Sequence, residues 1–322
     1  MLEVLAPDAA EYLAAAEAVG LIDRSERGKL AVSGPDAAMF LDSILSNDIG
    51  AIAPGHGAQA TFLTHKGRML ADVRVLVTDD EVLLDTERVS LQALFDALHQ
   101  LRIGYRVELH KRTLEVGLLS LIGPLAARPL GQSPAAGEFS HAATDVGGPA
   151  RVVRTRLGVD VLCGAADIDV VRSSLLAAGA VAIGPATYEC VRVEAGIPVY
   201  GDELDETAMP QEAGINERAV SYSKGCYIGQ ETVARLYWKG KPNRILRGLR
   251  YTEPVPRGAL LRQNEHDVGA VASVVSSPRL GLIGLALVRR EAEPGDMLSV
   301  TATDAVATVV ELPFGDASGA PS

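Results

Sequence analysis

The 322-residue sequence has few cysteines, few aromatic residues and no long apolar run. Its three cysteines, Cys163, Cys190 and Cys226, show no C-x-x-C spacing, which excludes a disulfide scaffold and a cysteine-rich zinc site. Aromatic residues make up only 4% of the chain, so its core must be mainly aliphatic. No stretch reaches the roughly 18 apolar residues of a membrane helix, and the N-terminus lacks the pattern of a signal peptide. We therefore expect a cytoplasmic protein without membrane contact.

Basic residues are outnumbered by acidic ones, 30 to 41, which gives a net charge of −11. This balance argues against a surface that follows nucleic acid throughout, although it is compatible with a local basic strip. The six histidines are scattered without the spacing of zinc ligands, so we expect no metal site. Hydrophobic residues, at 48%, suffice for a large core, and the length predicts about two domains.

Two segments in the first two-thirds of the chain resemble each other. Val32–Ala38 and Leu121–Ala127 both end an aliphatic run at Gly-Pro, where proline suits the first turn of a helix. A hairpin and a helix follow each copy: Arg68–Asp85 with Val89–Leu101, and Arg151–Cys163 with Asp169–Ala178. The pattern predicts an α+β fold of two lobes, each an antiparallel sheet with helices on one face.

The composition changes near Gly240. Beyond a linker at residues 239–244, short strands alternate with turns that contain proline or glycine, and no helical pattern intervenes. This arrangement predicts a small β-barrel over residues 243–314, followed by a flexible tail at 315–322. The expected strands are Ile245–Tyr251, Ala259–Arg262, Val268–Ser276, Leu280–Val288, Met297–Thr303 and Ala305–Leu312.

Cys226 differs from the other two cysteines because it lies between glycines in Tyr222–Glu231. Glycines allow a backbone to turn tightly or to approach a ligand closely. Lys224, two residues before the sulfur, favours the reactive thiolate. The alternative is an ordinary buried cysteine in a turn, as we expect for Cys163 and Cys190 in the core.

Glu194 is the other candidate binding residue. It lies with Arg192 just before Ala195–Pro198, where apolar and turn residues enclose the charge. An enclosed carboxylate can bind a planar N–H/NH2 edge through two parallel hydrogen bonds, and pterins and guanines present such an edge. A surface salt bridge between Arg192 and Glu194 is the alternative.

A basic stretch, residues 235–250, reverses the sign of the acidic chain. It holds six basic residues and no acidic one, together with Tyr237 and Trp238. Such a stretch suits a polyanion, either the phosphates of RNA or the carboxylate tail of a folate, which Arg235 could contact. The alternative is a solvated linker.

These residues resemble a known family. Lys224–Glu231 matches the K-G-C-Y-x-G-Q-E signature of the YgfZ-type folate-binding proteins, relatives of the glycine-cleavage T-protein, an aminomethyltransferase. Arg192–Met209 and Val268–Val288 resemble the T-protein superfamily more broadly. The resemblance implies two intertwined lobes, residues 1–25 with 111–215 and 26–110 with 216–240, beside a C-terminal β-barrel and around a central hole that binds tetrahydrofolate.

The resemblance also implies roles for single residues. Glu194 would hold the pterin edge, with Tyr188 supplying an aromatic face and Arg192 beside them. Cys226, with Lys224, would be the functional pair of a motif that continues through Gln230 and Glu231. We expect Glu194 and Cys226 to face one hollow. The implied function is to support iron–sulfur cluster assembly or repair and, through iron–sulfur enzymes, tRNA modification.

One departure separates this sequence from T-proteins. They carry a G-G-x-x-D-D segment whose first aspartate acts at the reacting nitrogen of the folate, and the matching run here is Gly67–Asp72. Ala71 occupies the first acidic place and cannot exchange a proton. Asp72 should point to the opposite face of the strand. The sequence therefore argues against methylene transfer.

Two other functions stay open. The chain could be a folate-dependent aminomethyltransferase or demethylase that uses a different base. Alternatively, it could be a module that binds tRNA through residues 235–250.

Overall fold

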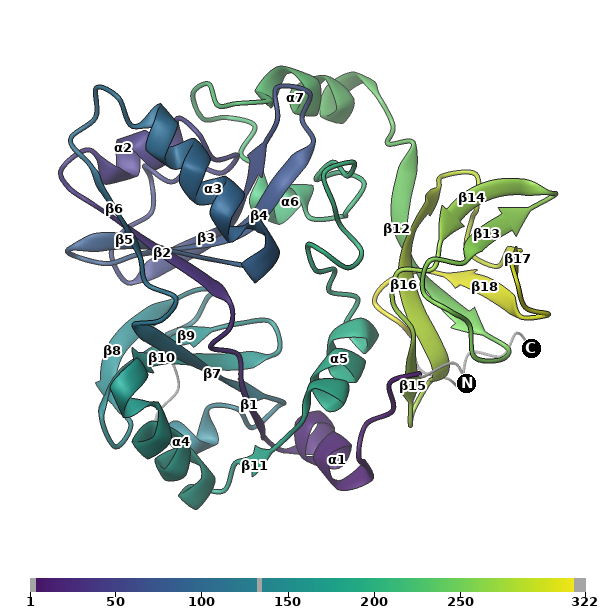
Figure 1. The fold of residues 1–322 in the computed structure, drawn as a ribbon, viewed down its shortest axis with the longest axis horizontal. Helices are drawn as coiled ribbons and strands as arrows, with labels where there is room; N and C mark the ends of the chain where they lie inside the picture. The colour runs from purple at the N-terminus through teal and green to yellow at the C-terminus, as the bar shows by residue number, and fades with distance from the viewer. Residues whose placement is uncertain (1–3, 132–134, 316–322) are drawn as a thin grey trace.

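The computed structural model describes residues 4–131 and 135–315, so the predicted tail lies almost wholly outside the described residues. Its strands form three sheets, and Figure 1 shows two of them stacked as lobes with the barrel beside them. The predicted α+β class with a C-terminal β-barrel is confirmed. No helix of the described residues is both long and apolar enough to cross a membrane.

The first lobe holds a five-stranded antiparallel sheet. Its strand order is β3 (His56–Leu63), β4 (Met69–Val77), β5 (Glu81–Thr86), β2 (Gly28–Ser33) and β6 (Glu108–Lys111). Helices α2 (Ala37–Asp42) and α3 (Arg88–Leu101) pack on one face. Helix α3 does so because Leu91, Leu94 and Leu98 recur at helical spacing and are all buried.

The second lobe repeats this strand order. It runs β8 (His141–Asp145), β9 (Pro149–Arg154), β10 (Gly158–Gly164), β7 (Val116–Ile122) and β1 (Gly20–Asp23), with β11 (Val181–Ala182) added beside β1. Helix α4 (Ile168–Ala177) covers one face, and short 3-10 turns lie at Arg128–Leu130 and Ala165–Asp167. The second copy of the repeated segment therefore continues as a 3-10 turn, where the first continues as α2.

Two helices, α1 (Ala9–Glu17) and α5 (Pro185–Glu194), lie side by side between the second lobe and the barrel. Helix α1 contacts α5, as Figure 1 shows. Helix α1 begins where the Asp8 carboxylate accepts hydrogen bonds from the backbone N–H groups of Ala10 and Glu11. Helix α5 begins with Pro185, whose fixed φ suits a first helical position.

The last helices lie on the first lobe. Helix α6 (Asn216–Ala219) contacts β3, and α7 (Gln230–Lys239) leads into the barrel. Helix α6 belongs to the chain beyond residue 215, so the first lobe contains two stretches that are far apart in the sequence. How the chain divides into independently folding units stays a prediction.

Six strands close the barrel. They run β12 (Arg244–Tyr251), β18 (Val306–Val310), β17 (Met297–Val300), β13 (Leu260–Gln263), β14 (His266–Ala270) and β16 (Gly281–Arg289), which pairs back with β12. The single strand expected at Val268–Ser276 is wrong. Residues 271–274 interrupt it, so that β14 and β15 (Val275–Ser277) pair with opposite ends of β16.

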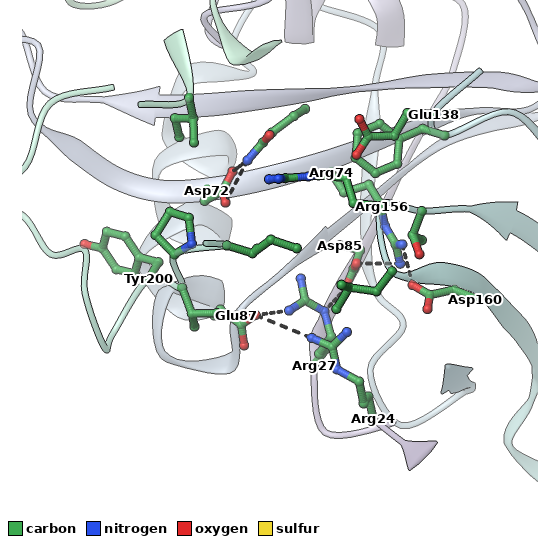
Figure 2. Close-up of a pocket in the computed structure, with 18 of the residues that line it drawn as sticks. Arg24, Arg27, Asp72, Arg74, Asp85, Glu87, Glu138, Arg156, Asp160 and Tyr200 are labelled. Atoms are coloured by element: carbon green, nitrogen blue, oxygen red, sulfur yellow. Dashed lines mark hydrogen bonds and ion pairs between the residues drawn. The ribbon is translucent and has the colours of Figure 1, made fainter. Parts of the chain in front are cut away.

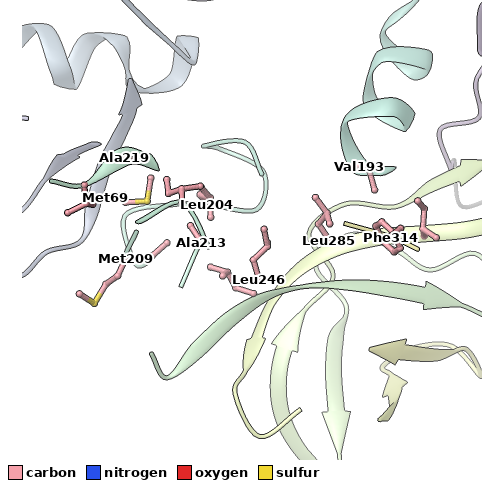
Figure 3. Packing of buried hydrophobic residues seen from close by; sticks show 14 of the residues in the cluster. Met69, Val193, Leu204, Met209, Ala213, Ala219, Leu246, Leu285 and Phe314 are labelled. Carbon is pink, nitrogen blue, oxygen red and sulfur yellow. The ribbon is translucent and has the colours of Figure 1, made fainter. Parts of the chain in front are cut away.

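A large apolar cluster joins the barrel to the lobes. Figure 3 shows Leu246 and Leu285 of the barrel near Val193 of α5 and Leu204 of the following segment, and the cluster extends to Met69 on β4. All five side chains are buried. The barrel is therefore packed against the lobes through a continuous core.

The chain after α5 is held by a buried ion pair. The Arg192 side chain is fully buried and pairs at 3.0 Å with Glu203, which is also buried. It also pairs with Glu189 and donates to the carbonyl of Ile197. All of these contacts lie within the protein, so we assign Arg192 a structural role rather than the expected ligand contact.

Arg192→Leu should lower the free energy of unfolding by about 3–5 kcal/mol, because it leaves the buried Glu203 carboxylate without its cation. Urea denaturation of the two proteins measures the difference. Arg172→Leu is the control, since that arginine pairs at the surface and should cost about 1 kcal/mol or less. Equal effects of the two substitutions would contradict the structural role of Arg192.

Candidate functional site

A polar row crosses the first sheet on the face opposite its covering helices. The strand register places Gln59, Arg74 and Asp85 side by side on β3, β4 and β5. In the second sheet, Asp160 on β10 pairs in register with Ser120 on β7. Arg74 forms an ion pair with Asp160, so the two rows face each other across one central cavity (Figure 2).

The rows are joined by a chain of buried ion pairs. The Arg74 guanidinium pairs with Asp160 and, at 2.7 Å, with Asp85. Asp85 also accepts a hydrogen bond of 2.8 Å from Arg27. Burial alone would raise the pKa of Asp85, but the positive charges of Arg27 and Arg74 outweigh it and lower the pKa to about 2. Asp85 and Asp160 therefore hold the two sheets together through their ion pairs with Arg74.

The central cavity has a volume of about 150 Å³. Tyr188 of α5 and the segment Ile197–Tyr200 line it together with the two sheets. The Arg24 guanidinium lies 4.4 Å from the centre of the Tyr188 ring, so the aromatic face is already in contact with a cation. The structure thus places Tyr188 at the cavity and adds Tyr200, which we had not expected there.

Asp72 also lines this cavity. The Gln59 amide nitrogen donates to both carboxylate oxygens, at 2.8 and 3.0 Å. Burial raises the pKa of Asp72, and the Gln59 hydrogen bond only partly offsets this. Asp72 is thus a carboxylate for which a cationic or N–H ligand group would be a favourable partner.

Ala71, by contrast, is fully buried in the core of the first lobe. The two neighbours do point to opposite faces, as expected from the alternation of a strand. However, the face of Asp72 is the one that lines the cavity. A carboxylate of this strand therefore lines the cavity even though Ala71 does not, and the argument from Ala71 against methylene transfer stays a prediction.

Glu194 lies in a different hollow, of about 840 Å³, between α1, α5 and the barrel. Its carboxylate accepts hydrogen bonds from Tyr12, at 2.9 Å, and from Ser277, and lies 3.5 Å from the Arg279 guanidinium. The two hollows share the side chains of Ile122, Arg156 and Leu157 in their walls. Glu194 is consequently already surrounded by donors, outside the central cavity.

Cys226 is exposed and lines neither hollow. The expectation that Glu194 and Cys226 face one hollow is therefore wrong. Glu194 is the last residue of α5, which packs against α1 and β15, whereas the cysteine lies in the loop before α7, over the first lobe.

Lys224 anchors that loop. Its side chain is only 1% exposed, and its ammonium group donates to the carbonyls of Asp42, Leu45 and Asn47 and to the Asp42 carboxylate. These oxygens belong to the end of α2 and the chain that follows it. At the other end of the loop, Gly229 has φ +85°, and a Cβ there would lie 2.5 Å from the Thr64 carbonyl. Lysine and glycine thus hold the loop at both ends.

The remaining motif residues lie at the start of α7. Gln230 donates to the Gly225 carbonyl at 3.3 Å, while Glu231 and Arg235 are exposed. None of the three lines the two hollows. The structure therefore does not bring the expected folate contacts Gln230, Glu231 and Arg235 to the cavity.

The basic stretch divides into two parts. Arg244, Arg247 and Arg250 lie on β12 and contact Glu212, Glu311 and the Leu280 carbonyl. The part on α7 is more exposed, and Tyr237 there stacks on Tyr222 with ring centres 3.8 Å apart. Any polyanion would thus meet the α7 part rather than the whole stretch.

Asp72 and the buried ion pairs had a signal in the sequence that we did not use. Asp72 and Arg74 are two residues apart in the apolar run Met69–Val77, and Asp160 interrupts a similar run on β10. Charged residues at alternate positions of an otherwise buried strand indicate a face that meets other polar groups rather than the core.

Comparisons with known proteins agree with this geometry. The family described as the GCVT N-terminal domain matches residues 4–224. The chain is 30% identical to an aminomethyltransferase of Rubrobacter xylanophilus, over 95% of this chain and 85% of that protein. It is 32% identical to an aminomethyltransferase of Mycobacterium leprae, over 89% and 82%.

The crystal structure of the glycine cleavage system aminomethyltransferase T from Bartonella henselae has the same fold. Its TM-score is 0.84 over 95% of this chain and 89% of that one, at 23% identity. The chain belongs to the GCVT N-terminal domain family.

Asp72→Asn should increase the free energy of unfolding at pH 7. Because burial raises the pKa of Asp72, its ionised form is less favourable in the folded than in the unfolded protein. The gain should shrink as the pH falls and vanish below about pH 4, where the carboxyl is protonated in both states. Urea unfolding between these pH values measures it, with the exposed Asp304→Asn as control. A less stable Asp72→Asn protein at pH 7 would refute this account.

Proposed function

We propose that this chain binds tetrahydrofolate in the central cavity and acts as a folate-dependent accessory protein for iron–sulfur enzymes. The observation that carries the folate assignment is the position of Asp72, a carboxylate held, among the described residues, by the Gln59 amide alone, which faces a cavity between two lobes of T-protein type. A carboxylate binds the N–H/NH2 edge of a pterin through paired hydrogen bonds. The relatives of this chain are named aminomethyltransferase, and that name supports a folate ligand.

The aromatic residues of the cavity support the same ligand. Tyr188 of α5 and Tyr200 of the segment after it both line the cavity, and a flat heterocycle can stack on such rings. Arg24 above Tyr188 adds positive charge next to that wall. The resemblance to YgfZ-type proteins assigns the pterin edge to Glu194, but three protein groups already surround that carboxylate. We therefore favour Asp72.

Titration of tetrahydrofolate into wild type, Asp72→Ala and Glu194→Ala tests this choice. Loss of a charge-assisted pair costs about 1.5–3 kcal/mol, so Asp72→Ala should bind roughly 10- to 100-fold more weakly. Glu194→Ala and the surface control Asp304→Ala should bind like the wild type. Calorimetry under anaerobic conditions gives the affinities.

Two outcomes would contradict the proposal. Wild-type protein that binds no folate would remove the ligand. A loss confined to Glu194→Ala would place the pterin in the hollow beside α1, as the resemblance has it.

The iron–sulfur role is supported by the octapeptide Lys224–Glu231, which we take to place the chain among the YgfZ-type proteins. The anchored loop holds the Cys226 thiol on the outside of the protein, where iron–sulfur enzymes or their assembly proteins can reach it. In this view the folate and the thiol act at separate places, and the tRNA modification that depends on iron–sulfur enzymes is affected indirectly.

Cys226→Ser should leave tetrahydrofolate affinity unchanged, because the sulfur lies outside the cavity, but should lower the activity of iron–sulfur enzymes in cells. Cys163→Ser, at a buried cysteine, is the control for nonspecific effects of losing a thiol. Full enzyme activity in cells that carry only the Cys226→Ser protein would refute a role of this thiol.

A second candidate function is folate-dependent aminomethyl transfer or demethylation, and Asp72 is the observation that favours it. A carboxylate with a raised pKa can exchange a proton with a reacting nitrogen or stabilise an adjacent cation. Formation of methylenetetrahydrofolate by the purified protein from an aminomethyl donor would establish this function in place of the accessory role.

Direct contact with tRNA is a third candidate function. It is supported by the exposed Arg235, Trp238 and Lys239 on α7, since cations bind phosphates and aromatic rings stack on bases. The engaged arginines of β12 would take little part in it.

A further inference from the structure

The wall that separates the two hollows is the tip of the hairpin between β9 and β10. Arg156 and Leu157 form this tip, and both side chains line the central cavity as well as the hollow beside α1. With Ile122 they make the only shared wall of these two hollows in the described part of the chain. A ligand that reached both hollows would contact this tip.

The hairpin tip is fixed in place. Thr155 and Gly158 exchange two backbone hydrogen bonds, of 2.9 and 3.4 Å, across the turn. A Cβ at Gly158 would lie 2.1 Å from the Leu121 carbonyl, so the turn lies directly on β7. Gly123 donates to the Leu157 carbonyl at 2.8 Å. Arg156 is thus held at the junction rather than on a mobile loop.

Arg156 also differs from the other arginines of the central cavity. Four of them have a carboxylate partner: Arg24 with Glu87, Arg27 with Asp85, Arg74 with Asp85 and Asp160, and Arg218 with Glu138. Among the described residues, Arg156 has no carboxylate within 4 Å, and its one hydrogen bond, to the Ala195 carbonyl, is 3.4 Å long.

The surroundings of Arg156 favour an anion. Its side chain is exposed to the hollows, yet partial desolvation and the charge of Arg218 lower the pKa of the guanidinium, while Glu138 opposes this only in part. Because no carboxylate of the described residues pairs with Arg156, it offers a positive charge and N–H donors in a planar fork, the geometry that carboxylates fit.

We infer that Arg156 binds the carboxylates of the glutamyl tail of folate. This inference rests on the proposed binding of tetrahydrofolate, with the pterin at Asp72 in the central cavity. The benzoyl ring then lies against the apolar side chains Ile122 and Leu157, and the tail carboxylates meet the guanidinium at the junction. Further glutamyl residues extend into the larger hollow. Arg156 thereby distinguishes a folate from a free pterin.

The test compares two probes, tetrahydrofolate and 6-methyltetrahydropterin, which lacks the benzoylglutamate. Arg156→Ala should weaken tetrahydrofolate binding about 10- to 100-fold and leave the binding of 6-methyltetrahydropterin unchanged. Arg156→Lys should recover part of the loss, because it restores the charge but not the planar fork. Arg128→Ala is the control, at an exposed arginine of the same lobe that lines neither hollow.

The outcomes separate this inference from the proposed function. Wild-type protein that binds neither probe overturns both. Wild-type binding of tetrahydrofolate with an equal affinity in Arg156→Ala overturns only the role of Arg156. An equal loss for both probes also overturns it, because the residue then acts on the pterin or on the fold. Thermal unfolding of Arg156→Ala should match the wild type, since no ion pair is lost.

Discussion

The arrangement of the two lobes depends on the guanidinium of Arg74. It is buried between the sheets, with Asp85 of its own sheet on one side and Asp160 of the other sheet on the other. Removing either carboxylate would leave charge in a medium of low dielectric constant, so the pairs hold the sheets in one relative position. The cavity with Asp72 exists because these polar faces meet each other instead of an apolar core.

The repeated strand order explains how such a cavity arises. Each sheet packs its apolar face against its own helices, so each lobe has a core of its own. The opposite, polar faces of the two sheets then lie against each other. Helix α5 and the chain after it close the remaining side, where Arg192 and Glu203 hold the turn that carries Tyr200. The two buried arginines therefore hold different parts of the cavity wall. Arg74 fixes the two sheets, and Arg192 fixes the segment that covers their junction.

The sequence allowed the fold class, the barrel and most strands to be predicted, because alternation and turn residues are local signals. Helix α7 was not predicted, since its residues were considered only as a motif and as part of a basic stretch, and Val233 is its one buried residue. The site was harder to predict. Glu194 was correctly recognised as an enclosed carboxylate, but which hollow encloses it depends on how α1 and the barrel pack around α5. Asp72 was assigned to the right face of its strand, yet the sequence does not reveal that the second lobe faces it.

The loop before α7 has a further consequence. An ammonium group buried among three carbonyls holds one end and a glycine against the β3–β4 turn holds the other, so the sulfur between them is presented without any movement of the lobes. The anchors of this loop lie away from the residues that line the cavity, so filling the cavity need not change how the thiol is displayed.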